Sequence, residues 1–212
     1  MKDIPFFTTE YGVASLSLGE IPYRQTAYIW VRDVQPGALE QLIAECAGFC
    51  RAAGAERIFW TAEDVGATPH CVIYEMRGTA QVDRDRLENL FPVTEATVKR
   101  WREIYNNRMT GVDHTATLTA FDEKRILQTG GAYFVHHDGE LLGIGWLEDT
   151  KLLAVASVKP GAGERVMNTL MSMVEGATMT LEVASTNERA IRLYERLGFL
   201  KTGEVTRWYT ET

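Results

Sequence analysis

The stretch LEVASTNERAIRLYERLGF, residues 181–199, contains a complete transition from strand to helix. Residues 178–184 alternate between apolar and polar side chains as a strand does, and Asn187 can cap the helix that follows. The apolar face of that helix consists of Ala190, Ile191, Tyr194 and Leu197, and Gly198 can end the helix. Residues 199–209 then predict a further strand.

The sequence before this stretch predicts a sheet and its covering helices. Residues 132–136, 140–147 and 152–158 are three strands joined by the turn sequences HDG and EDTK. Helices are expected at residues 94–105, 119–128 and 164–175. A helix of this length between two strands predicts a right-handed crossover, so the fold class is an α/β mixed sheet flanked by helices.

The first part of the chain has the pattern β-β-α-β-β. Its predicted strands are residues 13–18, 27–34, 57–61 and 71–77, and a helix follows Pro36 and ends near Gly54. Residues 79–91 are polar and charged, and Pro92 follows them, as in a connecting segment. We therefore expect two domains, residues 1–85 and residues 86–212.

The spacing within residues 181–199 resembles a motif of the GNAT superfamily of N-acetyltransferases. In that family a strand ending in L-x-V leads through an Asn to a helix with A-x-x-L-Y-x-x-x-G-F. The matching positions here are Asn187, Ala190, Leu193, Tyr194, Gly198 and Phe199. The resemblance covers residues 91–212 and implies a GNAT-like fold, with acetyl-CoA as a co-substrate and direct transfer of its acetyl group to an amine.

Tyr194 lies on the apolar face of its helix, so its hydroxyl needs either a hydrogen-bond partner or a role. A phenol beside the sulfur of a thioester can protonate the departing thiolate, and the resemblance implies that Tyr194 is this general acid. The alternative is a core tyrosine with a satisfied hydroxyl. Asn187 has two compatible roles, as a helix cap and, by resemblance, as a contact to the pantetheine arm.

Residues 152–170 resemble the strand, turn and helix with which the family holds its cofactor. A glycine-rich turn that leads into a helix directs unpaired N–H groups and the positive end of the helix dipole at one place, which suits a diphosphate. Arg165 or Lys159 could add positive charge. The predicted cofactor-binding residues are Ala156, Ser157, Val158, Gly161, Ala162, Gly163, Glu164, Arg165, Val166, Asn187 and Tyr194.

Two positions depart from the family pattern. Counting from Pro160, the pattern Gln/Arg-x-x-Gly-x-Gly/Ala falls on Gly163, Val166 and Asn168, so that its glycines are displaced toward the proline. Either Gly161 and Gly163 supply the close approach, or phosphate binding is weakened.

A general base is harder to assign, because the amine must lose a proton to a carboxylate, a histidine or water. Glu148, at the end of the middle strand, and Glu182, on the strand before the catalytic helix, are the candidates. His136 and His137 come behind them. Each of these side chains could equally be structural.

Residues 27–61 resemble the same cofactor-binding core more faintly. They have the order of strand, long helix and strand, but only one glycine in the turn and no N…LY…GF helix. A degenerate GNAT-like half-repeat is the favoured interpretation, and an unrelated α/β module stays open.

Composition limits the partners. The net charge of −7 argues against a nucleic-acid binder, and the sequence predicts no transmembrane segment or signal peptide, so a cytoplasmic protein without membrane partners is expected. The three cysteines, Cys46, Cys50 and Cys71, predict reduced core thiols, and no metal site is expected.

The predicted function is transfer of an acetyl group from acetyl-CoA to a primary amine of a small molecule or peptide. The acidic charge weakly favours a cationic amine such as a polyamine or an aminoglycoside. Two alternatives stay open: a module that binds CoA or acyl-CoA without turnover, and a structural pseudo-transferase. A homodimer is compatible with the sequence.

Overall fold

A computed structural model describes residues 2–62 and 66–210, and the chain forms two compact units. Unit 1 comprises residues 1–72 and 206–212, and unit 2 comprises residues 73–205. Within the described residues, no helix has the length and apolar character that crossing a membrane requires. The predicted division into domains at residue 85 stays a prediction.

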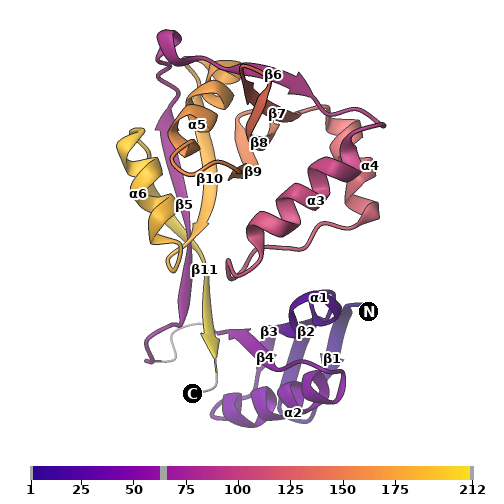
Figure 1. The fold of residues 1–212 in the computed structure, drawn as a ribbon. Coiled ribbons are helices and arrows are strands. Elements are labelled where there is room, and N and C mark those ends of the chain that lie inside the picture. Colours follow the sequence, from indigo (N-terminus) through magenta and orange to yellow (C-terminus); the bar gives the residue numbers. More distant parts are fainter. Residues whose placement is uncertain (1, 63–65, 211–212) are drawn as a thin grey trace. The chain divides into compact units, whose positions relative to one another are not determined.

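Unit 1 is a sheet with a helix packed on it. Its strands are β1 (Ile4–Thr8), β2 (Gly12–Ser17), β3 (Thr26–Val34) and β4 (Arg57–Thr61), and its helices are α1 (Ile21–Arg24) and α2 (Leu39–Ala52). β1, β2 and β3 pair antiparallel, whereas α2 connects β3 to a parallel β4 (Figure 1). The apolar side of α2 buries Leu42, Cys46 and Cys50 against the sheet. Burial raises the pKa of Cys46 to about 12, so this thiol keeps its proton.

The C-terminal end of the chain belongs to unit 1. β11 (Leu200–Thr210) pairs antiparallel with β4 through Tyr209 and Thr210. Trp208 packs edge-on against Trp30 with 4.6 Å between ring centroids, and Tyr209 stacks on Trp60 at 4.8 Å. Segments far apart in sequence therefore share one aromatic cluster.

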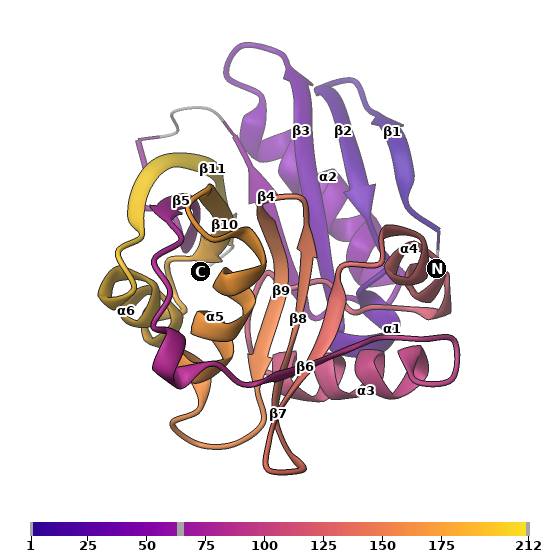
Figure 2. The same cartoon turned by 90° about the horizontal axis from the view of Figure 1, so that it is seen from above.

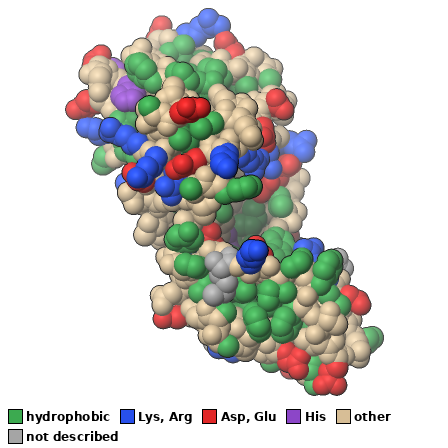
Figure 3. Space-filling view, turned by 90° about the vertical axis from the view of Figure 1, so that its right-hand side faces the viewer, with side chains coloured by type: hydrophobic (Ala, Val, Ile, Leu, Met, Phe, Trp, Pro, Cys, Tyr) green, Lys and Arg blue, Asp and Glu red, His purple; other side chains and the backbone are tan. Residues whose placement is uncertain are grey.

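One face of unit 1 carries a gathering of hydrophobic side chains (Figure 3). Among the large apolar side chains of this unit, Phe6 is 74% exposed, and Tyr23 and Phe49 are also exposed. β1, which carries Phe6, is an edge strand. Exposed apolar surface of this kind often contacts another molecule, and the homodimer stays a prediction.

Unit 2 is a mixed sheet covered by helices on both faces. Its remaining strands are β5 (Cys71–Thr79), β6 (Asn89–Pro92), β7 (Ala132–His137), β8 (Glu140–Glu148), β9 (Lys151–Ser157) and β10 (Thr178–Ala184). They are arranged in the order β5-β10-β9-β8-β7-β6, with the first part of β11 beside β5. The helices are α3 (Val98–Met109), α4 (Ala120–Thr129), α5 (Gly163–Met171) and α6 (Glu188–Arg196), with short 3-10 turns at Arg84–Arg86 and Ser172–Val174.

Two cores lie on opposite faces of this sheet. Helices α5 and α6 cover one face and α3 and α4 the other, as Figures 1 and 2 show. On the first face, Gly145 makes room for Leu170, because a Cβ at this glycine would lie 2.3 Å from the Leu170 Cδ1 atom. On the second face, Trp101 is fully buried and its indole N–H donates to the Tyr133 carbonyl at 3.0 Å.

The predicted α/β fold, a mixed sheet flanked by helices, is confirmed. The HDG turn is a tight hairpin in which Asp138 and Gly139 both have positive φ, 46° and 80°. Three details differ from the expectation. β1, β6 and the short helix α1 had not been predicted. From Ile73 onward β5 lies in unit 2, where it pairs antiparallel with β10 rather than completing the first sheet. Helix α5 also ends earlier, at Met171, and continues as a 3-10 turn.

Candidate functional site

The sheet of unit 2 opens between its two parallel strands. β9 and β10 pair only at Lys151 with Thr180 and at Leu152 with Leu181. Beyond that point β9 stays paired with β8 as far as Ser157, and β10 stays paired with β5 as far as Ala184. The facing edges of β9 and β10 therefore diverge, and their backbone groups are left for another partner.

A pocket of about 460 Å³ lies at this opening. Val155 packs with the core under α5 and α6, whereas its neighbour Ala156 packs with the core under α3, and both residues line the pocket. The pocket is thus reached from both faces of the sheet. Its lining residues are Arg108, Met109, Val112, Val155, Ala156, Ser157, Gly161, Gly163, Glu164, Met167, Asn187, Arg189, Ala190, Arg192, Leu193, Tyr194 and Arg196.

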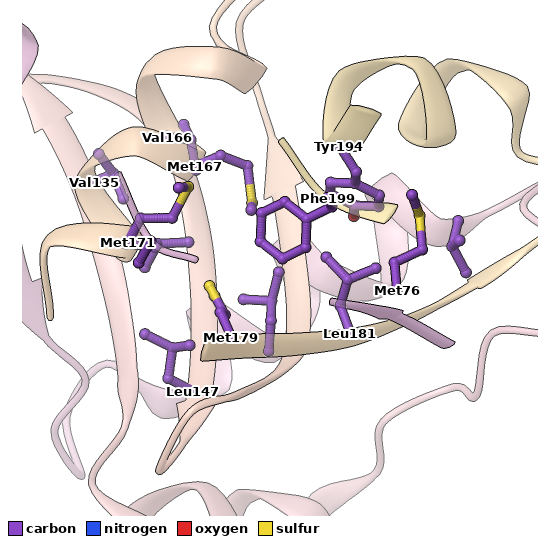
Figure 4. Packing of buried hydrophobic residues seen from close by; sticks show 14 of the residues in the cluster. Met76, Val135, Leu147, Val166, Met167, Met171, Met179, Leu181, Tyr194 and Phe199 are labelled. Atoms are coloured by element: carbon purple, nitrogen blue, oxygen red, sulfur yellow. The ribbon is translucent and has the colours of Figure 1, made fainter. Parts of the chain in front are cut away.

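Tyr194 is the buried titratable group of this pocket. The residue is 7% exposed, and its ring packs against Phe199 with 6.1 Å between centroids (Figure 4). Burial raises the pKa of Tyr194 to about 12. No other described residue forms a hydrogen bond with its hydroxyl. Its oxygen is not among the fully buried atoms that lack a partner, so it reaches the pocket and is available to a ligand.

The turn from β9 into α5 faces the same pocket. Gly161 has φ +79°, which a residue with a side chain rarely adopts, and Gly163 begins the helix. The N-cap residue, Ala162, provides no side-chain hydrogen bond, so the first N–H groups of α5 are not capped by a side chain. This open helix start can bind an anion.

The positive charges of the site come from a different element than expected. Arg165 forms an ion pair with Glu88, whose side chain is only 4% exposed, and Lys159 pairs with Glu140 at 3.0 Å. Instead, α6 presents a row of arginines at intervals of three and four residues, at Arg189, Arg192 and Arg196. Arg192 has a partner at 2.8 Å, the exposed carboxylate of Glu188. The spacing of the arginines in ERAIRLYER, residues 188–196, is the sequence pattern from which this row could have been predicted.

The row of arginines on α6 runs along the pocket, starting near the glycine turn. A second pocket of about 450 Å³ shares Gly161, Glu164 and Arg196 with the first one. The C-terminal end of α6 therefore lies close to the glycine turn, and the row extends away from it by about 10 Å, the length of seven helical residues.

The two departures from the glycine pattern serve packing. Val166 is fully buried and takes part in the core that covers β8. Asn168 is 6% exposed; its Oδ1 accepts from the Asp83 N–H and its Nδ2 donates to the Asp83 carbonyl, each at 2.8 Å. These side chains hold α5 against the sheet and against residues 83–86.

Four of the predicted cofactor residues, Val158, Ala162, Arg165 and Val166, do not line this pocket. Val158 continues from β9 and its N–H donates to the Leu142 carbonyl at 2.8 Å. Ala162 and Val166 are buried, and Arg165 lines the second pocket. Asn187 lines the first pocket and also caps α6, because its Oδ1 accepts from the Ala190 N–H at 3.2 Å.

The candidate bases are engaged in ion pairs. Glu148 pairs with Arg125 at 3.1 Å and Glu182 with Lys151 at 2.7 Å, and neither is among the residues that line the two pockets. His137 contacts Glu88 at 2.8 Å, and His136 packs edge-on against Phe91. The catalytic role of each stays a prediction.

Unit 1 repeats the crossover but not the opening. Its parallel strands β3 and β4 pair at five successive positions, from Thr26 with Arg57 to Trp30 with Thr61. Because these strands stay together, the described part of unit 1 has no widening that corresponds to the gap between β9 and β10.

Comparisons with known proteins find one family model and a set of similar folds. Residues 158–209 match the family model described as FR47-like protein. An acetyltransferase of the GNAT family from Colwellia psychrerythraea has 13% identity and a TM-score of 0.52, over 97% of this chain and 84% of that one. A putative acetyltransferase from Pyrococcus horikoshii has 14% identity and a TM-score of 0.57, over 95% and 70%.

A third solved structure is a tandem GNAT protein from the clavulanic acid biosynthesis pathway. It has 16% identity and a TM-score of 0.52, over 93% of this chain and 78% of that one. At these identities the likeness is one of fold. No curated protein sequence matches the chain.

Proposed function

We propose that the chain is an acyltransferase of the GNAT type, which moves an acetyl group from acetyl-CoA to a primary amine. The match of residues 158–209 to the FR47-like model and the likeness of fold to GNAT acetyltransferases support this proposal. One observation supports this proposal more than any other. The partnerless hydroxyl of Tyr194 and the open start of α5 line a single pocket, at the point where β9 and β10 separate. A thioester with a phosphate-bearing tail needs both features in one slot.

The donor would be held by backbone and by arginine. The N–H groups at Gly163 and Glu164 would face the diphosphate. Arg196, which has no carboxylate partner among the described residues, would supply positive charge in place of the neutralised Arg165. The free edge of β9 at Val155 to Ser157 can pair with the amide groups of the pantetheine arm. This alignment is the positioning contribution to the rate.

The reaction is a direct substitution at the thioester carbonyl. The amine nitrogen forms a bond to the carbonyl carbon, the carbon–sulfur bond breaks, and the products are an amide and the CoA thiol. Tyr194 donates a hydrogen bond, and finally a proton, to the sulfur. The proton lost by the amine goes to a base or through water, for which Glu148 and Glu182 stay candidates. No enzyme nucleophile is required.

The proposal is tested by binding and by thiol release. CoA at a hundred times its Kd should stabilise the protein by about 2.7 kcal/mol, which thermal denaturation detects. Acetyl-CoA with a broad panel of primary amines should release free thiol. If CoA binds and no amine gives release, the non-catalytic alternative is correct, and if CoA does not bind, both interpretations are wrong.

Substituting Gly163 should block donor binding. A Cβ at this position would lie 3.2 Å from the Leu193 Cδ2 atom, so the side chain of a Gly163→Leu variant would enter the narrow space between α5 and α6. We expect the Kd for CoA, measured by titration calorimetry, to rise at least about tenfold, the equivalent of 1.4 kcal/mol. Gly203→Val on β11 is the control, because nothing lies within 4 Å of its Cβ position. Equal affinity for both variants would contradict this placement of the donor.

A further inference from the structure

Part of the pocket is lined from the α3 side of the sheet, and we call this part its second mouth. Arg108, Met109 and Val112, at and just after the end of α3, line it there. The glycine turn and α6 line it on the opposite face, where the phosphates of a donor would lie. A second substrate can therefore enter from the α3 side without displacing the donor.

Arg108 is the charged group of this mouth. It is exposed, and it has no ion pair with a carboxylate in the part of the chain that the structure describes. By contrast, Arg102 on the same helix pairs with Glu123 at 2.7 Å, and Arg125 on α4 pairs with Glu148.

An arginine in the last turn of a helix interacts favourably with the helix dipole. This interaction would account for an arginine at position 108, but not for its position in the lining of the pocket. Beside it, Met109 and Val112 present apolar surface to the same space. A guanidinium next to apolar side chains suits a ligand with an anionic group on an apolar body, because arginine binds carboxylate or phosphate through two parallel hydrogen bonds.

We infer that the amine acceptor carries an anionic group, a carboxylate or a phosphate, and that Arg108 recognises it. The inference rests on the proposed acetyl transfer and adds the chemical class of the acceptor. It replaces the cationic acceptor that the net charge of −7 had favoured, because the charge lining one mouth outweighs a surface average.

Matched acceptor pairs test the inference. Tyramine and tyrosine differ by a carboxylate, and ethanolamine and O-phosphoethanolamine differ by a phosphate. We expect kcat/KM for thiol release to be at least about tenfold higher for the anionic member of one pair. The pair that shows this preference identifies the recognised anion as a carboxylate or a phosphate. Arg108→Gln should remove that preference by raising the acceptor KM, and Arg108→Lys should keep part of it.

Two measurements separate this inference from the proposed function. In Arg108→Gln the KM for acetyl-CoA should stay within about twofold of the wild-type value, a difference well below the tenfold that one charged contact contributes. Arg100→Gln, on the same helix but outside the pocket lining, should behave as wild type. Equal use of both members of each pair, or an Arg108→Gln effect on acetyl-CoA instead, overturns the inference and leaves acetyl transfer in place. Thiol release with none of the amines overturns both.

Discussion

Replacing Tyr194 with phenylalanine should slow thiol release from acetyl-CoA by about 10²- to 10⁴-fold, the range that a positioned general acid contributes. The loss should appear in kcat, because the hydroxyl acts on the sulfur only as the carbon–sulfur bond breaks. The Kd for CoA should change little, since the turn at Gly161 and the arginines of α6 are untouched. Steady-state kinetics with calorimetry measures both quantities.

The high pKa of Tyr194 shapes its role. A phenol with a pKa of about 12 holds its proton throughout the neutral and mildly alkaline range, so this acid is present whenever the donor binds. That pKa lies roughly three to four units above the value of an ordinary thiol, so complete transfer to a free thiolate is uphill. Most of the effect should therefore come from the hydrogen bond to the developing negative charge. Ionisation of Tyr194 should therefore cause no decrease in kcat below about pH 11.

The stability of Tyr194→Phe distinguishes a catalytic tyrosine from a structural one. Because no described residue forms a hydrogen bond with this hydroxyl, removing it should leave the free energy of unfolding unchanged or higher. A variant that is as stable as wild type and nearly inactive supports the proposal. A destabilised variant, or one with full activity, would show that Tyr194 is a core residue and nothing more.

Local patterns predicted the parts of the site that are continuous in sequence. The helix with Asn187 as its cap and Tyr194 on its buried face was predictable because a cap, an apolar periodicity of 3.6 and a terminal glycine are all encoded within residues 187–198. The turn at Gly161 was predictable for the same reason. In both places the residues that decide the conformation are neighbours.

Contacts between distant segments were not predictable. Arg165 was expected to bind phosphate, but Glu88, 77 residues earlier, neutralises it. Arg108 comes from a helix that precedes the cofactor segment and reaches the pocket only because that helix lies on the other face of the sheet. The strand at residues 73–79 looks like the end of the first sheet, and only its pairing with β10 places it in unit 2. Which strand pairs with which depends on tertiary packing, on which a single sequence carries little information.

The same core that supports Tyr194 should be the most sensitive point of unit 2. Phe199 is fully buried, and its ring packs against the Tyr194 ring (Figure 4). It also contacts β5, because a Cβ at Gly78 would be only 3.0 Å from the Phe199 Cγ atom. Truncating the ring leaves a cavity that a glycine backbone cannot fill. We expect Phe199→Ala to lower the free energy of unfolding by about 3 to 5 kcal/mol.

Urea denaturation of Phe199→Ala, followed by tryptophan fluorescence, to which Trp101 and Trp146 of unit 2 contribute, measures this loss. Leu200→Ala is the matched control, because the next side chain along β11 is 70% exposed and should change stability by less than about 0.5 kcal/mol. Under conditions where the variant is still folded, its kcat should also fall, since the Tyr194 ring has lost the surface that orients it. A loss of stability below about 1 kcal/mol would mean that the core can collapse onto the cavity, and that Tyr194 is positioned by the α6 backbone alone.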